Sequence, residues 1–112
     1  MVTRAFLPGL PMNYFLFRLN PPRLSFPADM TPVERQLMQE HAVYWRGLMK
    51  KNLVVAFGPV ADPKGAYGIA ILRLEDGSNA NALCVNDPVI RADAGFSFEL
   101  HPMLSVVLPE EQ

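Results

Sequence analysis

The most regular pattern along the chain is an amphipathic segment from Thr31 to about Lys51. At about 100° per residue on a helical wheel, its apolar side chains fall within one half of the circumference: Val33, Leu37, Met38, Tyr44, Trp45, Leu48 and Met49. Thr31 offers a capping hydroxyl, Pro32 suits the first helical position, and Glu34 completes a capping box. The pattern therefore predicts a helix that starts after Thr31 and that Asn52 closes.

One histidine, His41, falls near the centre of the apolar half of this helix. An ionisable group that faces a core needs a partner or a cavity, because burying it unpaired costs several kcal/mol. Histidine exchanges protons near neutral pH, so His41 is a candidate general base or acid. The alternative is a core histidine whose ring nitrogens bond a backbone carbonyl or a carboxylate and serve packing alone.

Alternating or two-sided apolar runs predict the β-strands. We expect them at 12–19, 53–57, 66–74 and 96–101, with Gly58-Pro59 ending the second. Several prolines predict a loop over 20–30. The apolar residues 103–108 are expected either to extend the last strand or to form a short extra one.

A short second helix is predicted from Ser78 or Asn79 to Asn86, where Asp87-Pro88 interrupts it, and 89–94 is expected to form a further turn. The order is then β-α-β-β-α-β, a ferredoxin-like antiparallel sheet with two helices on one face, in the α+β class. The first and third strands, however, carry apolar residues on both faces. Such strands need cover on both sides, so we predict a homodimer packed through its sheet faces.

Length and composition indicate one domain. The chain has 112 residues, of which 50% are hydrophobic, so we expect a single α+β domain over 12–108 after an irregular N-terminal arm, 1–11. No apolar run approaches the ~20 residues that span a bilayer. Cys84 is the only cysteine, which excludes an internal disulfide and suits a reducing compartment, so a cytoplasmic location is expected.

Charge narrows the classes of partner. The net charge is −1, and no lysine or arginine cluster is longer than Lys50-Lys51. Nucleic acids and anionic membranes attract proteins through positive charge, so neither is an expected partner. His41 and His101 are the only histidines and belong to no tight ligand pattern, so no metal and no cofactor are expected. A small-molecule ligand or a protein partner is left.

Short segments in a fixed order resemble the YCII-related (YciI-like) domain family: HAVYWRGL from His41, LVVAFGP from Leu53, Asp62, Gly65, and DPVIRA from Asp87. The similarity covers roughly residues 41–107 and implies a dimeric α+β barrel. It also implies an enzymatic role that rests on a histidine and an aspartate matching His41 and Asp87. The wider superfamily includes proteins that act on aromatic compounds and others that isomerise lactones. The loop over 20–30 departs from the family pattern, because it is longer and richer in proline, and its length is enough to cap the pocket.

Asp87 is the candidate partner of His41. Because it precedes Pro88, its backbone is biased to the extended region and its carboxylate can face back toward the sheet. A carboxylate bonded to His41 would hold one tautomer and stabilise the protonated ring, as in catalytic triads. Alternatively, Asp87 forms an Asx-type turn that serves the local backbone.

Tyr44, Trp45, Asp62 and Arg91 are candidates for substrate binding. Tyr44 and Trp45 follow His41 by about one helical turn, and they either line a pocket for a ring-shaped ligand or belong to the core. Asp62 either enters the pocket as a second acid or shapes the turn before Pro63. Arg91 either pairs with an anionic substrate or lies on the surface.

The leading hypothesis is a small, cofactor-independent enzyme in which His41 and Asp87 carry acid–base chemistry on a small organic molecule that can contain a ring. Isomerisation and elimination are the reactions that fit such a pair. The alternative is a non-catalytic dimer, either a small-molecule-binding module or a structural one.

Overall fold

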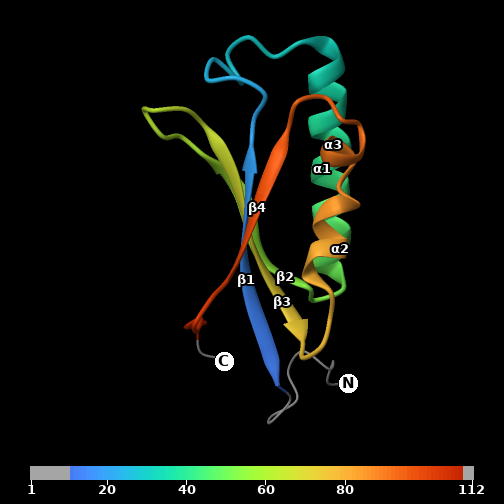
Figure 1. Ribbon diagram of the computed structural model, residues 1–112, viewed down its shortest axis with the longest axis vertical. Helices are drawn as coiled ribbons and strands as arrows, with labels where there is room; N and C mark the ends of the chain where they lie inside the picture. The colour runs from blue at the N-terminus through green and yellow to red at the C-terminus, as the bar shows by residue number, and fades with distance from the viewer. Residues whose placement is uncertain (1–10, 110–112) are drawn as a thin grey trace.

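The computed structural model describes residues 11–109. Its elements follow the order β1 (Met12–Asn20), α1 (Pro32–Lys50), β2 (Val54–Val60), β3 (Tyr67–Glu75), α2 (Ala80–Val85), α3 (Pro88–Arg91) and β4 (Ser97–Pro102). The strands form one sheet in the order β2-β3-β1-β4, and every neighbouring pair is antiparallel. The helices lie on one face of this sheet (Figure 1). The predicted α+β class and ferredoxin-like order are confirmed, whereas residues 1–10 of the expected arm lie outside the described residues.

Helix α1 begins as its capping signals predict. The Thr31 hydroxyl accepts a hydrogen bond from the Glu34 amide at 3.1 Å, and the Glu34 carboxylate accepts one from the Thr31 amide at 3.0 Å. Asn52 follows the helix with a left-handed φ of 63°, a conformation that asparagine tolerates at helix ends. One expected core position is wrong: Val33 is 69% exposed. Val33 lies at the edge of the apolar arc and in the first turn of the helix. A helical wheel does not indicate whether the sheet extends far enough to cover that turn.

Three further boundaries differ from the expectations. β2 runs through Gly58-Pro59 instead of ending there, because β2 is an edge strand and an edge tolerates a residue without an amide hydrogen. The expected turn after Asp87 contains the one-turn helix α3, so three helices rather than two cover the sheet. Residues 103–109 form no regular strand. Only a bond from the Met103 amide to the Tyr14 carbonyl, at 2.8 Å, continues the pairing after β4.

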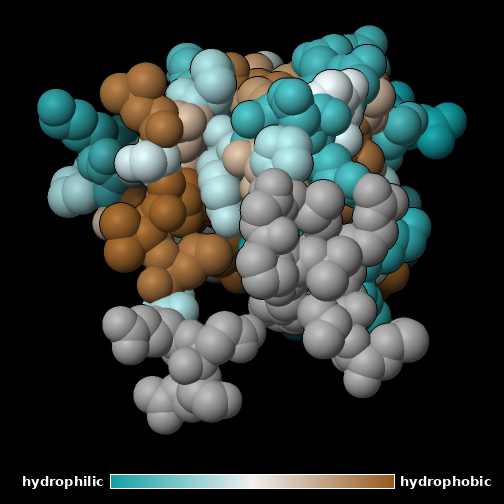
Figure 2. Space-filling view, turned by 90° about the horizontal axis from the view of Figure 1, so that it is seen from below, coloured by the Kyte–Doolittle hydropathy of each residue, from teal (hydrophilic) through white to brown (hydrophobic). Residues whose placement is uncertain are grey.

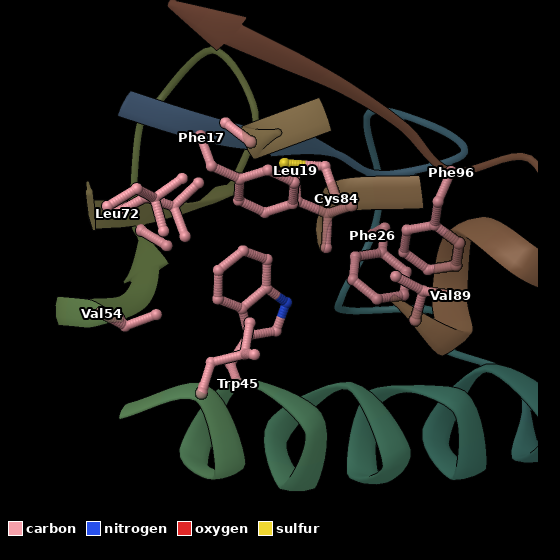
Figure 3. Packing of buried hydrophobic residues seen from close by; sticks show 13 residues of the cluster. Phe17, Leu19, Phe26, Trp45, Val54, Leu72, Cys84, Val89 and Phe96 are labelled. Atoms are coloured by element: carbon pink, nitrogen blue, oxygen red, sulfur yellow. The ribbon is translucent and has the colours of Figure 1, made fainter. Parts of the chain in front are cut away.

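The hydrophobic core fills the space between the helices and the sheet. Trp45 projects from α1 toward Phe17 of β1, with the ring centroids 4.6 Å apart (Figure 3). Trp45 and Leu72 of β3 are fully buried. At one end of the layer Phe26 meets Phe96 edge to face, with centroids 5.4 Å apart (Figure 3).

The opposite face of the sheet carries half-buried apolar residues that no element within 11–109 covers. Leu16 pairs with Ile71 across β1 and β3, and Ile69 lies two residues before Ile71 on the same face. Hydrophobic residues gather on the side of the molecule away from the helices, while the helix side is mostly hydrophilic (Figure 2). Within the described part of the chain, no helix is both long and apolar enough to cross a membrane.

Candidate functional site

A buried polar cluster joins α1 to the start of α3. Asp87 is fully buried, and its Oδ2 lies 2.7 Å from His41 Nδ1. The same oxygen accepts a hydrogen bond from Trp45 Nε1 at 2.7 Å, and Oδ1 accepts one from the Val89 amide at 3.0 Å. The carboxylate therefore leaves water without losing its hydrogen bonds, which is the condition for burying such a group at modest cost.

Local sequence explains why these groups meet. His41 and Trp45 are four residues apart and share one face of α1. Asp87 is the N-cap of α3, with an extended backbone ahead of Pro88 at the first helical position. Its carboxylate therefore both caps α3 and reaches α1. The local-turn role and the histidine-orienting contact, which the sequence presented as alternatives, occur together.

The contact with Asp87 determines where the His41 proton lies. An ionised carboxylate only accepts hydrogen bonds, so Nδ1 of a neutral ring carries the hydrogen and donates it. The other nitrogen, Nε2, is then unprotonated and can accept a proton. Within 11–109 the contact with Asp87 is the only hydrogen bond of the His41 ring.

His41 also borders a cavity of about 330 Å³. α1, β1, β2, β3 and the loop between β1 and α1 build its wall, which is almost entirely apolar. The largest apolar side chains in it, besides Trp45, are Phe17, Phe26, Met30, Met38, Phe57 and Phe96. An unprotonated imidazole nitrogen beside a hollow of this kind has the surroundings of a base or a hydrogen-bond acceptor.

The remaining predicted binding residues lie in different places. Trp45 belongs to the cavity wall, whereas the Tyr44 hydroxyl donates to the Leu83 carbonyl at 2.6 Å, toward α2. Asp62 shapes the turn between β2 and β3 by accepting from the Lys64 amide at 2.8 Å. Arg91 is exposed at the end of α3. Contact with a ligand stays a prediction for Tyr44, Asp62 and Arg91, none of which lines the cavity.

Comparison with known families agrees with this fold. Residues 12–104 match the sequence profile of the YCII-related domain. The chain belongs to the YCII-related domain family. The similarity noted in the sequence begins at His41. The family match begins earlier and therefore also includes β1, the proline-rich loop and the first part of α1. No curated protein matches the chain significantly.

The loop between β1 and α1 contributes to this YCII-related site, in line with the expectation that it caps the pocket, but sequence reasoning did not identify which of its residues would do so. Pro21, Phe26, Pro27 and Met30 all line the cavity. Prolines and an isolated phenylalanine in a loop carry no periodic signal, so nothing in the pattern places them near His41. Met38 is different, because it lies on the same face of the helical wheel as His41. That shared face was the signal that could have placed Met38 beside His41.

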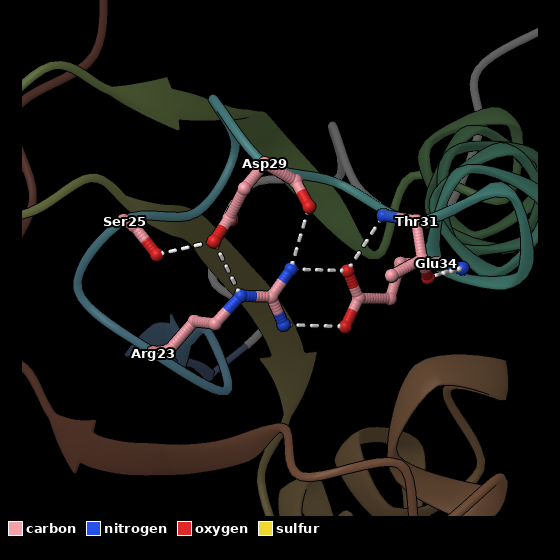
Figure 4. Close-up of polar contacts among 5 residues, drawn as sticks. All are labelled: Arg23, Ser25, Asp29, Thr31 and Glu34. Atoms are coloured by element: carbon pink, nitrogen blue, oxygen red, sulfur yellow. Dashed lines mark hydrogen bonds and ion pairs between the residues drawn. The ribbon is translucent and has the colours of Figure 1, made fainter.

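A second polar cluster ties the same loop to the start of α1 (Figure 4). Arg23 holds Glu34 through two guanidinium hydrogen bonds of 2.7 Å each. It also donates to the Asp29 carboxylate and to the Asp29 carbonyl, both at 2.9 Å. These bonds raise the pKa of Arg23 above its ordinary value, lower the pKa of Asp29, and lower that of Glu34 to about 2. Arg23 therefore anchors the segment that carries Phe26 and Met30.

Cys84 packs close to Asp87, but as a neutral thiol. Burial, and secondarily the charge of Asp87, raise the pKa of Cys84 to about 12. Burial, followed by the same carboxylate, also raises the pKa of Tyr44. A thiolate nucleophile does not form near neutral pH under these conditions. Among residues 11–109 no three histidine, cysteine, aspartate or glutamate side chains gather as metal ligands would.

Proposed function

We propose that this YCII-related protein is a cofactor-independent enzyme that transfers a proton on a small organic molecule. His41 acts as base and acid, and Asp87 is the positioning residue. One observation carries the proposal: the His41 ring is held by a buried carboxylate on one side while it borders an apolar cavity. Isomerisation and elimination are the reactions that need this arrangement and no further group.

The geometry supports a simple sequence of steps. Nε2 of His41 removes a proton from an activated carbon, and the electron pair of the broken C–H bond forms a C=C bond. In an elimination a leaving group departs with its own electron pair. In an isomerisation the π pair of the adjoining C=O bond moves onto its oxygen as an enolate, and the C=O bond forms again when the protonated ring returns the proton to another carbon of the conjugated system. Asp87 stabilises the imidazolium in both cases, and the apolar wall keeps competing water away.

Proton exchange with heavy water tests the reaction class without knowledge of the substrate. The protein is incubated in D₂O with a panel of cyclic ketones, lactones and chlorinated cyclic alcohols, and NMR follows deuterium incorporation. We expect catalysed exchange with at least one compound, and a loss of about 10²–10⁴-fold in rate for His41→Ala.

The second histidine supplies the matched control. His101 is exposed on β4 and lies outside the cavity wall, so His101→Ala should keep the wild-type rate. Circular dichroism of both variants checks that the fold persists. Equal exchange by wild type and by folded His41→Ala would refute the enzyme proposal. Ligand binding without any exchange would favour the non-catalytic binding module.

We also propose the homodimer, in which the uncovered sheet faces pack together. The half-buried residues Leu16 and Ile71 support it, since sheets of this kind are stable when both faces are covered. Sedimentation should give a dimer at micromolar concentration, and Ile71→Asp should give a monomer. Val43→Asp, on the exposed side of α1, should leave the dimer intact. A wild-type monomer would contradict this assembly.

The cytoplasm is the proposed location. Cys84 is the only cysteine of the chain, and a lone thiol suits a reducing compartment. Imaging of a fluorescently tagged full chain tests this, and an extracellular or membrane signal would overturn it.

A further inference from the structure

Apart from His41, the cavity wall has no side chain that can neutralise an ion near neutral pH. None of its residues is an aspartate, glutamate, lysine or arginine, and His41 and Tyr67 are its only ionisable side chains. The Trp45 indole N–H already donates to Asp87. Beside the neutral ring of His41, a carboxylate, phosphate or ammonium group placed here would lose water without gaining an oppositely charged partner, which is unfavourable.

Besides Tyr67, whose ring is stacked against Arg18 at 3.8 Å, the same wall offers one polar side chain, His41. When the His41 ring is neutral and donates its Nδ1 hydrogen to Asp87, it has an acceptor at Nε2 and no donor there. The complement of an acceptor is a hydrogen-bond donor on the ligand, such as a hydroxyl or an acidic C–H. The cavity of about 330 Å³ lies at the small end of the range for ligand pockets, which starts at about 300 Å³.

From these observations we infer that the pocket takes an uncharged molecule with an apolar, ring-sized body and a single donor group directed at His41. This inference rests on the proposed function, because it uses the same unprotonated Nε2.

Phe26 determines how large the ligand body can be. Its ring belongs to the wall and packs edge to face on Phe96, with centroids 5.4 Å apart. The loop that carries it is anchored by the Arg23–Glu34 ion pair. Removing the Phe26 ring would extend the cavity toward this loop, so a longer ring system should then fit.

Trp45 provides the probe for a binding experiment. It is the only tryptophan in the chain and lies in the wall, so its indole N–H gives a single reporter peak in a ¹⁵N-labelled sample. The peak is followed during titration at neutral pH with 2-naphthol, 2-methoxynaphthalene, 2-naphthoate and 2-naphthylmethylammonium. We expect 2-naphthol to bind at least about tenfold more tightly than either ion, and more tightly than the methoxy compound.

Three variants sharpen the result. His41→Phe should remove the preference for 2-naphthol over 2-methoxynaphthalene while the ions stay excluded. Phe26→Ala should increase the affinity for 2-anthrol relative to 2-naphthol. Leu24→Ala, in the same loop but 82% exposed, should leave that ratio unchanged. Circular dichroism verifies that each variant is folded.

Two results would overturn the inference. One is binding of 2-naphthoate or of the ammonium compound as tight as that of 2-naphthol. The other is the absence of any Trp45 peak shift with all of the probes. Both are distinct from a failure of the proposed function, which shows as unchanged deuterium exchange in His41→Ala. Proton transfer can therefore be verified while the ligand class is rejected.

Discussion

Two polar clusters involve α1, and they differ in what they leave free. At the start of the helix, Arg23 uses all three guanidinium nitrogens on Glu34 and Asp29. In the middle of the helix, the bond to Asp87 occupies only one nitrogen of the His41 ring. The first cluster is saturated by its own members and holds two segments together. The second keeps one polar atom for a ligand.

The two clusters also differ in their surroundings. Asp87 is fully buried and the His41 side chain is 13% exposed; in the outer cluster Glu34 is similar at 11%, but the Arg23 and Asp29 side chains are 34% and 47% exposed. Water therefore screens the charge of Asp87 little and the charges of Arg23 and Asp29 more strongly. Removing one member of the inner cluster should therefore have the larger effect, since exposed ion pairs contribute little to stability.

The largest expected effect is that of Asp87→Ala. This change leaves the Trp45 N–H and the Val89 amide without an acceptor in the core, so the free energy of unfolding should fall by about 3 kcal/mol or more. Urea denaturation measures it. Asp62→Ala, which removes an aspartate from a turn, should cost less than about 1 kcal/mol. Equal losses in the two variants would mean that burial does not distinguish these carboxylates.

Asp87→Asn separates positioning from packing. The amide keeps the size of the carboxylate, but it can donate toward His41 Nδ1 and favours the opposite tautomer, with the hydrogen on Nε2. We expect deuterium exchange to fall by about 10²–10⁴-fold, while the fold, verified by circular dichroism, persists. The pH dependence of the rate should shift as well. An unchanged rate and pH profile would make Asp87 a structural residue only.

Arg23→Ala should loosen the loop between β1 and α1 without abolishing proton transfer. The melting temperature should fall by a few degrees, by less than in Asp87→Ala, and amide hydrogen exchange at Phe26 and Met30 should quicken. Arg35→Ala, an exposed arginine on α1, serves as the control and should change neither quantity. If folded Arg23→Ala lost as much catalysed deuterium exchange into substrate as Asp87→Asn does, the two clusters would not differ in function as proposed.

The smallest effect is a pH dependence of stability at the outer cluster. The hydrogen bonds from Arg23, followed by that from the Thr31 amide, hold the pKa of Glu34 at about 2, below its ordinary 4.5. Protonation therefore favours the unfolded chain, and this contribution is present above about pH 4.5 and lost as the pH falls toward 2. The melting temperature should decrease over that range, and less steeply in Glu34→Gln. Identical slopes in both proteins would contradict this linkage.

Local signals determined much of the fold in advance. The capping residues and helical period of α1 act within a few residues of one another, so they predict where the helix starts and that His41 faces inward. Strand alternation works over the same short range and predicted β1, β3 and β4. Together with the order of elements, these signals determined the α+β class and the family resemblance.

Only the tertiary structure decided how these pieces complete the site. The path of β2 through Gly58-Pro59 depends on β2 being an edge strand, which pairing alone determines. Asp87 is 46 residues from His41 in sequence, and its double contact with α3 and α1 requires the docking of one helix on the other. Phe26 reaches the cavity because Arg23 anchors its loop. Such contacts depend on how the whole core packs, and the residues of any one short segment do not determine that packing.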